Sequence, residues 1–173
     1  MPLGDLVKLG DGVTLGNGVT IGDLVKLGNG VTLGDEVTLG NGVKLGNWVT
    51  LGNGVKLGNG VKLGDEVTIG NWVTLGDGVT LGDGVKLGNG VKLGNGVTLA
   101  SSPLQIRGPR YMVYPHAPGL IGCGCEIHSL DEWEACGRLL AEKYGSVGDA
   151  DLYWTYIKQV YAWMEKNMKE GVS

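Results

Sequence analysis

The sequence has no phenylalanine, and it has only two histidines and three cysteines among its 173 residues. The cysteines are odd in number and all lie after residue 122, which does not fit a framework of disulfides. Seven basic and nine acidic residues lie on each side of residue 100, so neither half has the basic excess that binding to a phosphate backbone requires. The charge pattern therefore excludes nucleic acid as the expected partner.

Long apolar runs are also missing. No stretch approaches the roughly 20 apolar residues of a membrane-spanning helix. No basic segment followed by an apolar one precedes the first repeat, as it would in a signal peptide. We expect a cytoplasmic protein without membrane contact.

What the sequence has in abundance is one six-residue phrase, Leu/Ile-Gly-Asp/Asn-x-Val-Thr/Lys, which runs sixteen times from Leu3 to Thr98. The Val and the following Leu or Ile are two positions apart, so they share one face of a short strand, and the Thr or Lys between them lies on the other. Gly-Asp/Asn, followed by Gly in ten phrases, favours a tight corner. Strands and corners that alternate every six residues predict a solenoid around a Val and Leu interior.

The phrase resembles the hexapeptide repeat of left-handed parallel β-helix proteins, a family that includes acyl- and acetyltransferases and γ-class carbonic anhydrases. The resemblance covers residues 3–99 and implies a triangular solenoid with three phrases in each coil, about five coils in all, and residues eighteen apart stacked. We therefore expect a mainly β fold with a solenoid over residues 1–100. The regularity of the repeat is also typical of a consensus-designed array.

Stacking turns the outward residues into columns. One face carries Lys8, Lys26, Lys44 and Lys62, and a second carries Thr14, Thr32, Thr50 and Thr68. We interpret the lysines as a solubilising face rather than an anion-binding stripe. The threonines are interpreted as ordinary β-favouring residues rather than an ice-binding surface.

Six corners break the rule of glycine after Asp or Asn: Leu6, Leu24, Glu36, Trp48, Glu66 and Trp72. Corner side chains project outward, so two leucines and two tryptophans should be exposed. Because tryptophan is enriched in interface cores, we take Leu6, Leu24, Trp48 and Trp72 as candidates for an oligomer interface. We predict a closed homo-oligomer. The family resemblance favours a trimer over a dimer.

Residues 101–173 depart from the repeat and predict a small α+β capping domain that covers the C-terminal end of the solenoid. Segments 104–107, 111–114 and 120–125 are expected as a short β-hairpin and a third strand, with a turn at 115–119. Ser129 and Glu132 form a capping box that opens a helix running to Tyr144.

A second helix should start at Asp149 or Asp151. Its expected inward positions are Leu152, Tyr156, Val160, Trp163 and Met164. The tail also resembles, loosely, C-terminal regions of hexapeptide-repeat proteins from bacteria and their phages. That resemblance rests on Gly124-Cys125 and on Asp131-Glu132-Trp133, and it implies no activity.

Transferases of the family usually carry a catalytic histidine in or beside the coils. Residues 3–99 contain no His, Cys or Ser and no inserted loop, so we predict no catalytic and no cofactor-binding residues. In the tail, Cys123, Cys125, His128 and Cys136 are candidate zinc ligands. The Cys-x-Cys spacing is unusual for zinc, however, and buried reduced cysteine is the expected state, so no metal or other cofactor is predicted.

These observations together predict a non-enzymatic structural or binding scaffold that self-associates. Two alternatives stay open at this point: an acyl- or acetyltransferase of the hexapeptide-repeat family, and a phage-encoded protein that binds a host factor.

Overall fold

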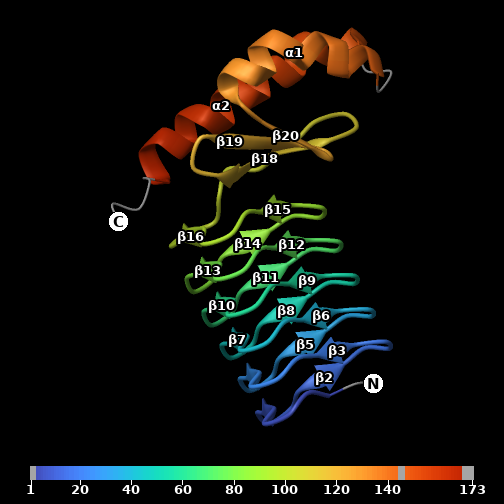
Figure 1. The fold of residues 1–173 in the computed structure, drawn as a ribbon, viewed down its shortest axis with the longest axis vertical. Coiled ribbons are helices and arrows are strands. Elements are labelled where there is room, and N and C mark those ends of the chain that lie inside the picture. Colours follow the sequence, from blue (N-terminus) through green and yellow to red (C-terminus); the bar gives the residue numbers. More distant parts are fainter. Residues whose placement is uncertain (1–2, 144–146, 169–173) are drawn as a thin grey trace. The chain divides into compact units, whose positions relative to one another are not determined.

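The structure is a computed structural model that describes residues 3–143 and 147–168. The chain divides into two compact units, Met1–Pro103 and Leu104–Ser173, which are described separately. The first unit is the predicted parallel β-solenoid of about five coils, with three parallel sheets (Figure 1). The predicted left-handed parallel β-helix fold is thus confirmed.

Each side of the solenoid is one sheet of two-residue strands. The first sheet contains β1 (Lys8–Leu9), β4 (Lys26–Leu27), β7 (Lys44–Leu45), β10 (Lys62–Leu63), β13 (Thr80–Leu81) and β16 (Thr98–Leu99). The second contains β2 (Thr14–Leu15), β5 (Thr32–Leu33), β8 (Thr50–Leu51), β11 (Thr68–Ile69) and β14 (Lys86–Leu87). The third contains β3 (Thr20–Ile21), β6 (Thr38–Leu39), β9 (Lys56–Leu57), β12 (Thr74–Leu75) and β15 (Lys92–Leu93).

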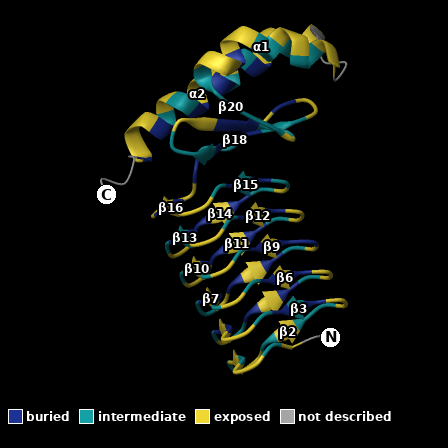
Figure 2. Cartoon of the chain, in the orientation of Figure 1, coloured by how far each residue is buried: buried dark blue, intermediate teal, exposed yellow. Residues whose placement is uncertain are grey.

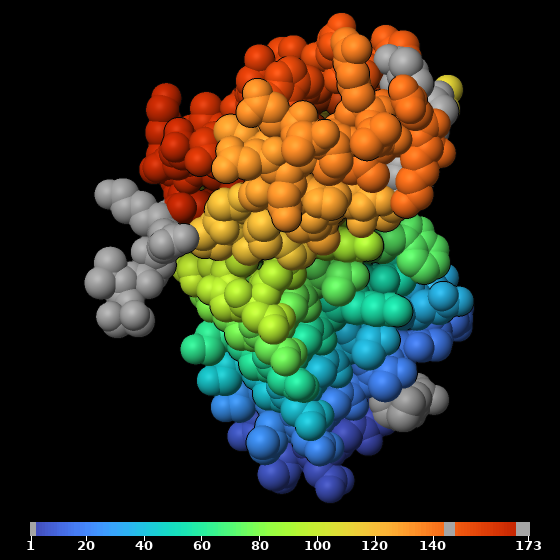
Figure 3. Space-filling model, turned by 45° about the horizontal axis from the view of Figure 1, so that its top comes forward, coloured from blue at the N-terminus to red at the C-terminus, as the bar shows by residue number. Residues whose placement is uncertain are grey.

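The register pairs residues eighteen apart, as in Thr32 with Thr50 and Thr50 with Thr68. Every valine of the phrase from Val19 to Val91 is fully buried, and the leucines that follow point into the same interior. Figure 2 shows this core alternating with exposed outward positions, and Figure 3 shows successive coils as bands from blue to green. In the first coil, Leu3 and Leu9 are about half exposed because no further coil covers them.

The corners explain why the phrase uses Asp or Asn after glycine. From Asp5 to Asp77, the backbone N–H of each such residue donates to the Oδ1 of the Asp or Asn eighteen residues later, at 2.6–3.0 Å. A short side chain with an acceptor oxygen is needed to close this ladder. The repeat therefore encodes a side-chain ladder at the corners as well as the backbone ladder of the sheets.

The second unit is an antiparallel sheet in the order β17 (Ile106–Arg107), β18 (Met112–Ala117), β19 (Leu120–Cys123) and β20 (Glu126–Ser129). Helices α1 (Leu130–Lys143) and α2 (Ala150–Asn167) pack on the sheet, with the 3₁₀ turn η1 (Val147–Asp149) before α2 (Figure 1). The predicted end of the first helix at Tyr144 lies outside the described residues. Among the described residues, neither helix combines the length and apolar composition that crossing a membrane requires.

The structure corrects three expectations for this unit. Residues 115–117 continue strand β18 rather than forming a turn. Strand β17 pairs only with Met112 and Val113, so the edge of β18 at Pro115 is open on that side. Proline has no backbone N–H, and at an open edge no hydrogen bond from that group is required. Residues 126–129 form a fourth strand. In α2, Leu152 is exposed, and the buried stripe is Tyr153, Ile157, Val160 and Met164.

Candidate functional site

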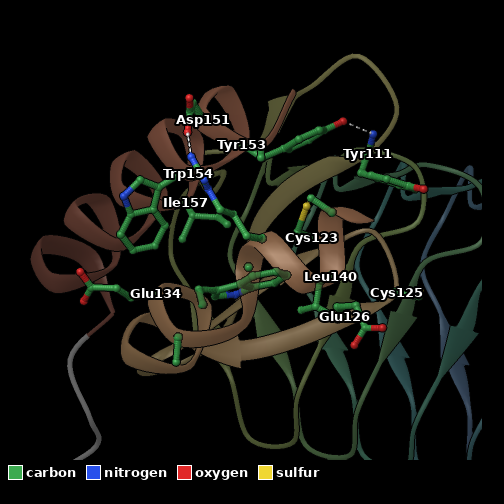
Figure 4. A pocket seen from close by; sticks show the side chains of 16 residues that line it. Tyr111, Cys123, Cys125, Glu126, Glu134, Leu140, Asp151, Tyr153, Trp154 and Ile157 are labelled. Atoms are coloured by element: carbon green, nitrogen blue, oxygen red, sulfur yellow. Dashed lines mark hydrogen bonds and ion pairs between the residues drawn. The ribbon is translucent and has the colours of Figure 1, made fainter. Parts of the chain in front are cut away.

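A cavity of about 350 Å³ lies in the second unit, between the sheet and the two helices (Figure 4). Its walls are largely aromatic and apolar, and they include Tyr111, Trp133, Tyr153, Trp154 and Ile157. Polar groups join them from the end of β19, the turn after it, the start of β20 and both helices: Cys123, Cys125, Glu126, Glu134, Arg138 and Asp151. A cavity of this size and lining fits a small organic group.

Two aromatic walls of the cavity are held by hydrogen bonds to the backbone. The indole Nε1–H of Trp133 donates to the carbonyl of Ile121 at 3.0 Å, which joins α1 to β19. The hydroxyl oxygen of Tyr153 accepts from the backbone N–H groups of Arg110 and Tyr111, both at 2.8 Å, which joins α2 to the turn before β18. Buried Trp and Tyr normally find such partners, and here the partners fix the rings.

The start of α1 is set by the predicted capping box, which is confirmed. The backbone N–H of Ser129 donates to Glu132 Oε2 at 2.9 Å, and the backbone N–H of Glu132 donates to Ser129 Oγ at 3.3 Å. The hydrogen bonds from the backbone and then the side chain of Ser129 lower the pKa of Glu132. The Glu132 carboxylate is therefore held beside the end of β20.

His128 lies between two carboxylates beside the cavity. Its Nε2 is 3.4 Å from Glu126 Oε2, and its Nδ1 is 3.9 Å from Glu132 Oε2. Lys143 Nζ is 3.5 Å from the other oxygen of Glu126. Nε2 is shielded from solvent, and no hydrogen bond of good geometry to it occurs among the described residues. The imidazole also meets the ring of Trp133 edge-on, with centroids 5.0 Å apart.

This arrangement joins His128 to the cavity, because Glu126 and Trp133 both contact the imidazole and line the cavity wall. The sequence predicted His128 as a candidate zinc ligand, and its two carboxylate neighbours were not predicted. A signal was present: Glu126 and His128 are two apart, so they share a face if the segment is a strand, and Glu132 belongs to the capping box.

The zinc candidates are not brought together. No group of three His, Cys, Asp or Glu suited to a metal occurs in the part of the chain that the structure describes. Burial, and then the nearby Cys125, raises the pKa of the Cys123 thiol to about 12, so it stays protonated at neutral pH. Cys136 Sγ lies 2.8 Å from the carbonyl of Glu132, to which it donates within α1.

The four interface candidates stand at all three corners of the solenoid. Leu6 and Leu24 share one corner, where the N–H of Leu24 donates to the carbonyl of Asp5 at 2.8 Å. Trp48 and Trp72 stand at the other two, and all four side chains are exposed.

Comparison with known families finds two matches within the coils. Residues 30–65 and 66–101 match the family described as bacterial transferase hexapeptide (six repeats). Residues 7–23 match the hexapeptide repeat of succinyl-transferase. Together these segments span roughly half of the chain. No curated protein sequence matches the chain.

Several solved structures are similar to this chain. A hexapeptide transferase family protein from Anaplasma phagocytophilum is 15% identical, with 91% of this chain and 92% of that chain covered and a TM-score of 0.39. UDP-N-acetylglucosamine acyltransferase from Campylobacter jejuni is 15% identical, with 96% and 92% covered and a TM-score of 0.35. WeeI from Acinetobacter baumannii AYE is 17% identical with a TM-score of 0.33, and the match covers 61% of this chain and 54% of that one.

The chain thus spans only about half the length of WeeI. The family matches, in contrast, overturn two predictions. The expected non-enzymatic scaffold and the expected absence of enzymatic activity are wrong, because the matching family is one of transferases. None of the matches supports the interpretation of the repeat as a consensus design. The phage-encoded binding protein stays a prediction.

Proposed function

The chain belongs to the hexapeptide-repeat family of left-handed parallel β-helix proteins, and on that premise we propose that it is an acyltransferase. The proposed reaction moves an acyl group from a thioester, such as an acyl-CoA, to a hydroxyl or amine acceptor. The observation that carries this proposal is the match of the coils to families of bacterial transferases and succinyl-transferases.

His128 is the proposed general base. Acyl transfer needs a group that removes the acceptor's proton as the acceptor attacks the thioester carbonyl, and histidine serves this role most often. The coils contain no histidine, whereas the second unit holds His116 and His128, so we place the base in the second unit. Of the two, His128 has carboxylates near both ring nitrogens.

The neighbours of His128 suit this role. A carboxylate beside one ring nitrogen, Glu126 at Nε2 or Glu132 at Nδ1, holds the proton on that nitrogen, and the lone pair of the other nitrogen accepts the acceptor's proton. Lys143 Nζ lies 3.5 Å from the other Glu126 oxygen. The proton then passes to the departing thiolate as the tetrahedral intermediate collapses.

The cavity is the proposed place for the transferred acyl group or the acceptor. Its aromatic walls exclude water from an acyl chain, and Glu126 and Trp133 connect it to the base. Cys123 lines the same cavity, but its protonated thiol is a weak nucleophile. The proposal therefore assigns direct transfer to the acceptor rather than a thioester on the protein.

The test is turnover of acetyl-CoA and succinyl-CoA, followed as the loss of thioester absorbance, with binding measured by calorimetry. We expect micromolar binding, and we expect His128→Asn to lower the turnover rate by about 10²- to 10⁴-fold. His116→Asn is the matched control and should keep wild-type turnover. Failure of both thioesters to bind or react at millimolar concentration would refute the proposal.

We also propose that the chain self-associates. The four exposed corner residues occupy three corners, so one flat contact cannot include them all. Leu6 and Leu24 stack at one corner, and they make the more compact apolar contact for a second subunit. A trimer remains our favoured assembly.

A further inference from the structure

Six corners of the solenoid hold a backbone conformation that their side chains disfavour. Their φ angles are 58–60°, in the left-handed region. For a residue other than glycine this region costs roughly 1–2 kcal/mol. Ten other corners of the same repeat use glycine at this position. Strain of this kind is concentrated at functional sites in proteins, so the placement of the six is informative.

Four of the six, Glu36, Trp48, Glu66 and Trp72, surround the same side of the solenoid. Each strand of the second sheet has one corner before it and one corner after it. In three consecutive coils, the corner residues before and after the strand are Gly30 and Glu36 for β5, Trp48 and Gly54 for β8, and Glu66 and Trp72 for β11. The two leucines, Leu6 and Leu24, lie at the third corner, between the third and first sheets. The aromatic and acidic corners thus all flank one surface, the second sheet.

The two tryptophans are arranged alike. The ring of Trp48 lies against Gly30 of the preceding coil, and the ring of Trp72 lies against Gly54, so closely that a methyl group on either glycine would overlap the indole. The side chains nevertheless remain 65% and 62% exposed. Each indole is therefore supported by the corner backbone while much of its surface stays open to solvent.

The floor between the corners is uncharged and polar. Thr32, Thr50 and Thr68 point outward in register from β5, β8 and β11, about 4.8 Å apart. The first lysine of this column is Lys86, one coil beyond. Apolar rings at the edges of a hydroxyl floor do not resemble a protein-binding surface, whose centre is apolar and whose rim is polar.

We propose that this surface binds a neutral oligosaccharide of hexopyranose units. The apolar C–H face of a pyranose stacks on an exposed indole, and its hydroxyl groups donate to carboxylates such as Glu36 and Glu66 and exchange hydrogen bonds with threonine hydroxyls. Six residues separate the two corners of a coil, which spans up to about 20 Å. The ligand is therefore a chain of sugars rather than one ring, and the two carboxylates disfavour acidic glycans. This site is separate from the cavity and does not depend on the proposed acyl transfer.

The test is calorimetric titration of the full chain with cellohexaose, chitohexaose and maltohexaose. We expect one of the three to bind, and we expect Trp48→Gly and Trp72→Gly each to weaken that binding at least about tenfold. Glu36→Gln and Glu66→Gln should weaken it about threefold. The tryptophan variants restore the residue that the repeat prefers, so the fold should be retained, which circular dichroism checks.

Leu24→Gly is the matched control, because it removes an exposed apolar side chain from a corner of the same geometry that does not border the second sheet. It should leave the affinity for the sugar unchanged. The proposal is overturned if no hexasaccharide binds at millimolar concentration, or if Leu24→Gly weakens binding as much as Trp48→Gly. It is also overturned if Trp48→Gly dissociates an oligomer of the wild type, or if oligolysine competes fully with the sugar, since these results identify a second copy or a cationic chain as the occupant.

Discussion

Two glycines of one phrase, Gly58 and Gly60, separate the two reasons for which the repeat needs glycine. A Cβ on Gly58 would lie 2.7 Å from the backbone nitrogen of Asp77 and 2.8 Å from the carbonyl carbon of Gly76, and it would also meet the Oδ1 of Asp77. Gly60 has open space around it, with nothing within 4 Å of an added Cβ, but its φ is +67°. We therefore expect Gly58→Ala and Gly60→Ala to destabilise the solenoid by different mechanisms and different amounts.

The magnitudes follow from these contacts. At Gly60 the only cost is a left-handed conformation, about 1 kcal/mol. At Gly58 the next coil must move by several tenths of an ångström, although its strands are held by hydrogen bonds such as Gly76 N–H to Leu93 O at 2.9 Å. Overpacking against backbone that cannot relax costs about 3 kcal/mol. The expected difference between the two variants in the free energy of unfolding is about 2 kcal/mol. Both variants make the same Gly→Ala change, so they do not differ in net charge.

Urea unfolding followed by circular dichroism measures this difference as a shift in midpoint at constant m-value. Glu66→Gly provides the reverse change, since it relieves a left-handed residue at φ 59° and should stabilise the coils by about 1 kcal/mol. Equal midpoints for Gly58→Ala and Gly60→Ala would refute the argument that close approach of the coils sets the cost at Gly58.

Other predictions concern the second unit and the assembly. Iodoacetamide should modify the exposed Cys125 before Cys123, whose thiol burial keeps protonated, and mass spectrometry of peptides would show a reversed order if this is wrong. Because the pKa of Cys123 is raised from 9.0 to about 12, the unfolded chain ionises first as the pH rises, so stability should fall between these values, and Cys123→Ala should remove that slope. Ser129→Ala should destabilise α1 by about 1 kcal/mol. Because the pKa of Glu132 is lowered from its ordinary value of 4.5, the ionised carboxylate stabilises the start of the helix at pH values above 4.5. This contribution should be lost as the pH falls through the lowered pKa. Leu24→Gly should weaken self-association in light scattering, and a wild type that is an 18.1 kDa monomer at high concentration would exclude the proposed assembly.

The coils could be predicted from the sequence because every determinant is local and repeated. Alternation of Val and Leu, the glycine corners and the eighteen-residue stacking give the sheets and the buried interior directly. The hydrogen bond from each corner N–H to the Asp or Asn of the next coil was not predicted, since it depends on contacts between coils that the phrase alone does not display.

The second unit was predicted less completely because its determinants are non-local. The capping box of Ser129 and Glu132 involves residues three apart and was found. Strand β20 was missed because its residues do not alternate between apolar and polar, and its pairing of His128 with Ile121 becomes visible only in the sheet. Pro115 was interpreted as part of a turn, since the short length of β17 that tolerates it cannot be derived from the strand itself.

The candidate site shows why the absence of histidine from the coils was a poor argument against an enzyme. The missing histidine shows only that the coils do not supply a histidine base. The second unit contains two histidines, so the chain as a whole can still carry such a base. Cys123 pairs with Glu126 across β19 and β20, and Ile121 pairs with His128, so Glu126 and His128 share one face of the sheet. The carbonyl of Ile121 also accepts the hydrogen bond from Trp133. Glu126 and Trp133, which both contact His128, also line the cavity. A base carried by the non-repeating unit leaves the coils under no requirement to interrupt their repeat. The regularity that favoured a scaffold is therefore equally expected of a transferase whose chemistry lies outside the coils, and turnover by His128→Asn against His116→Asn distinguishes the two.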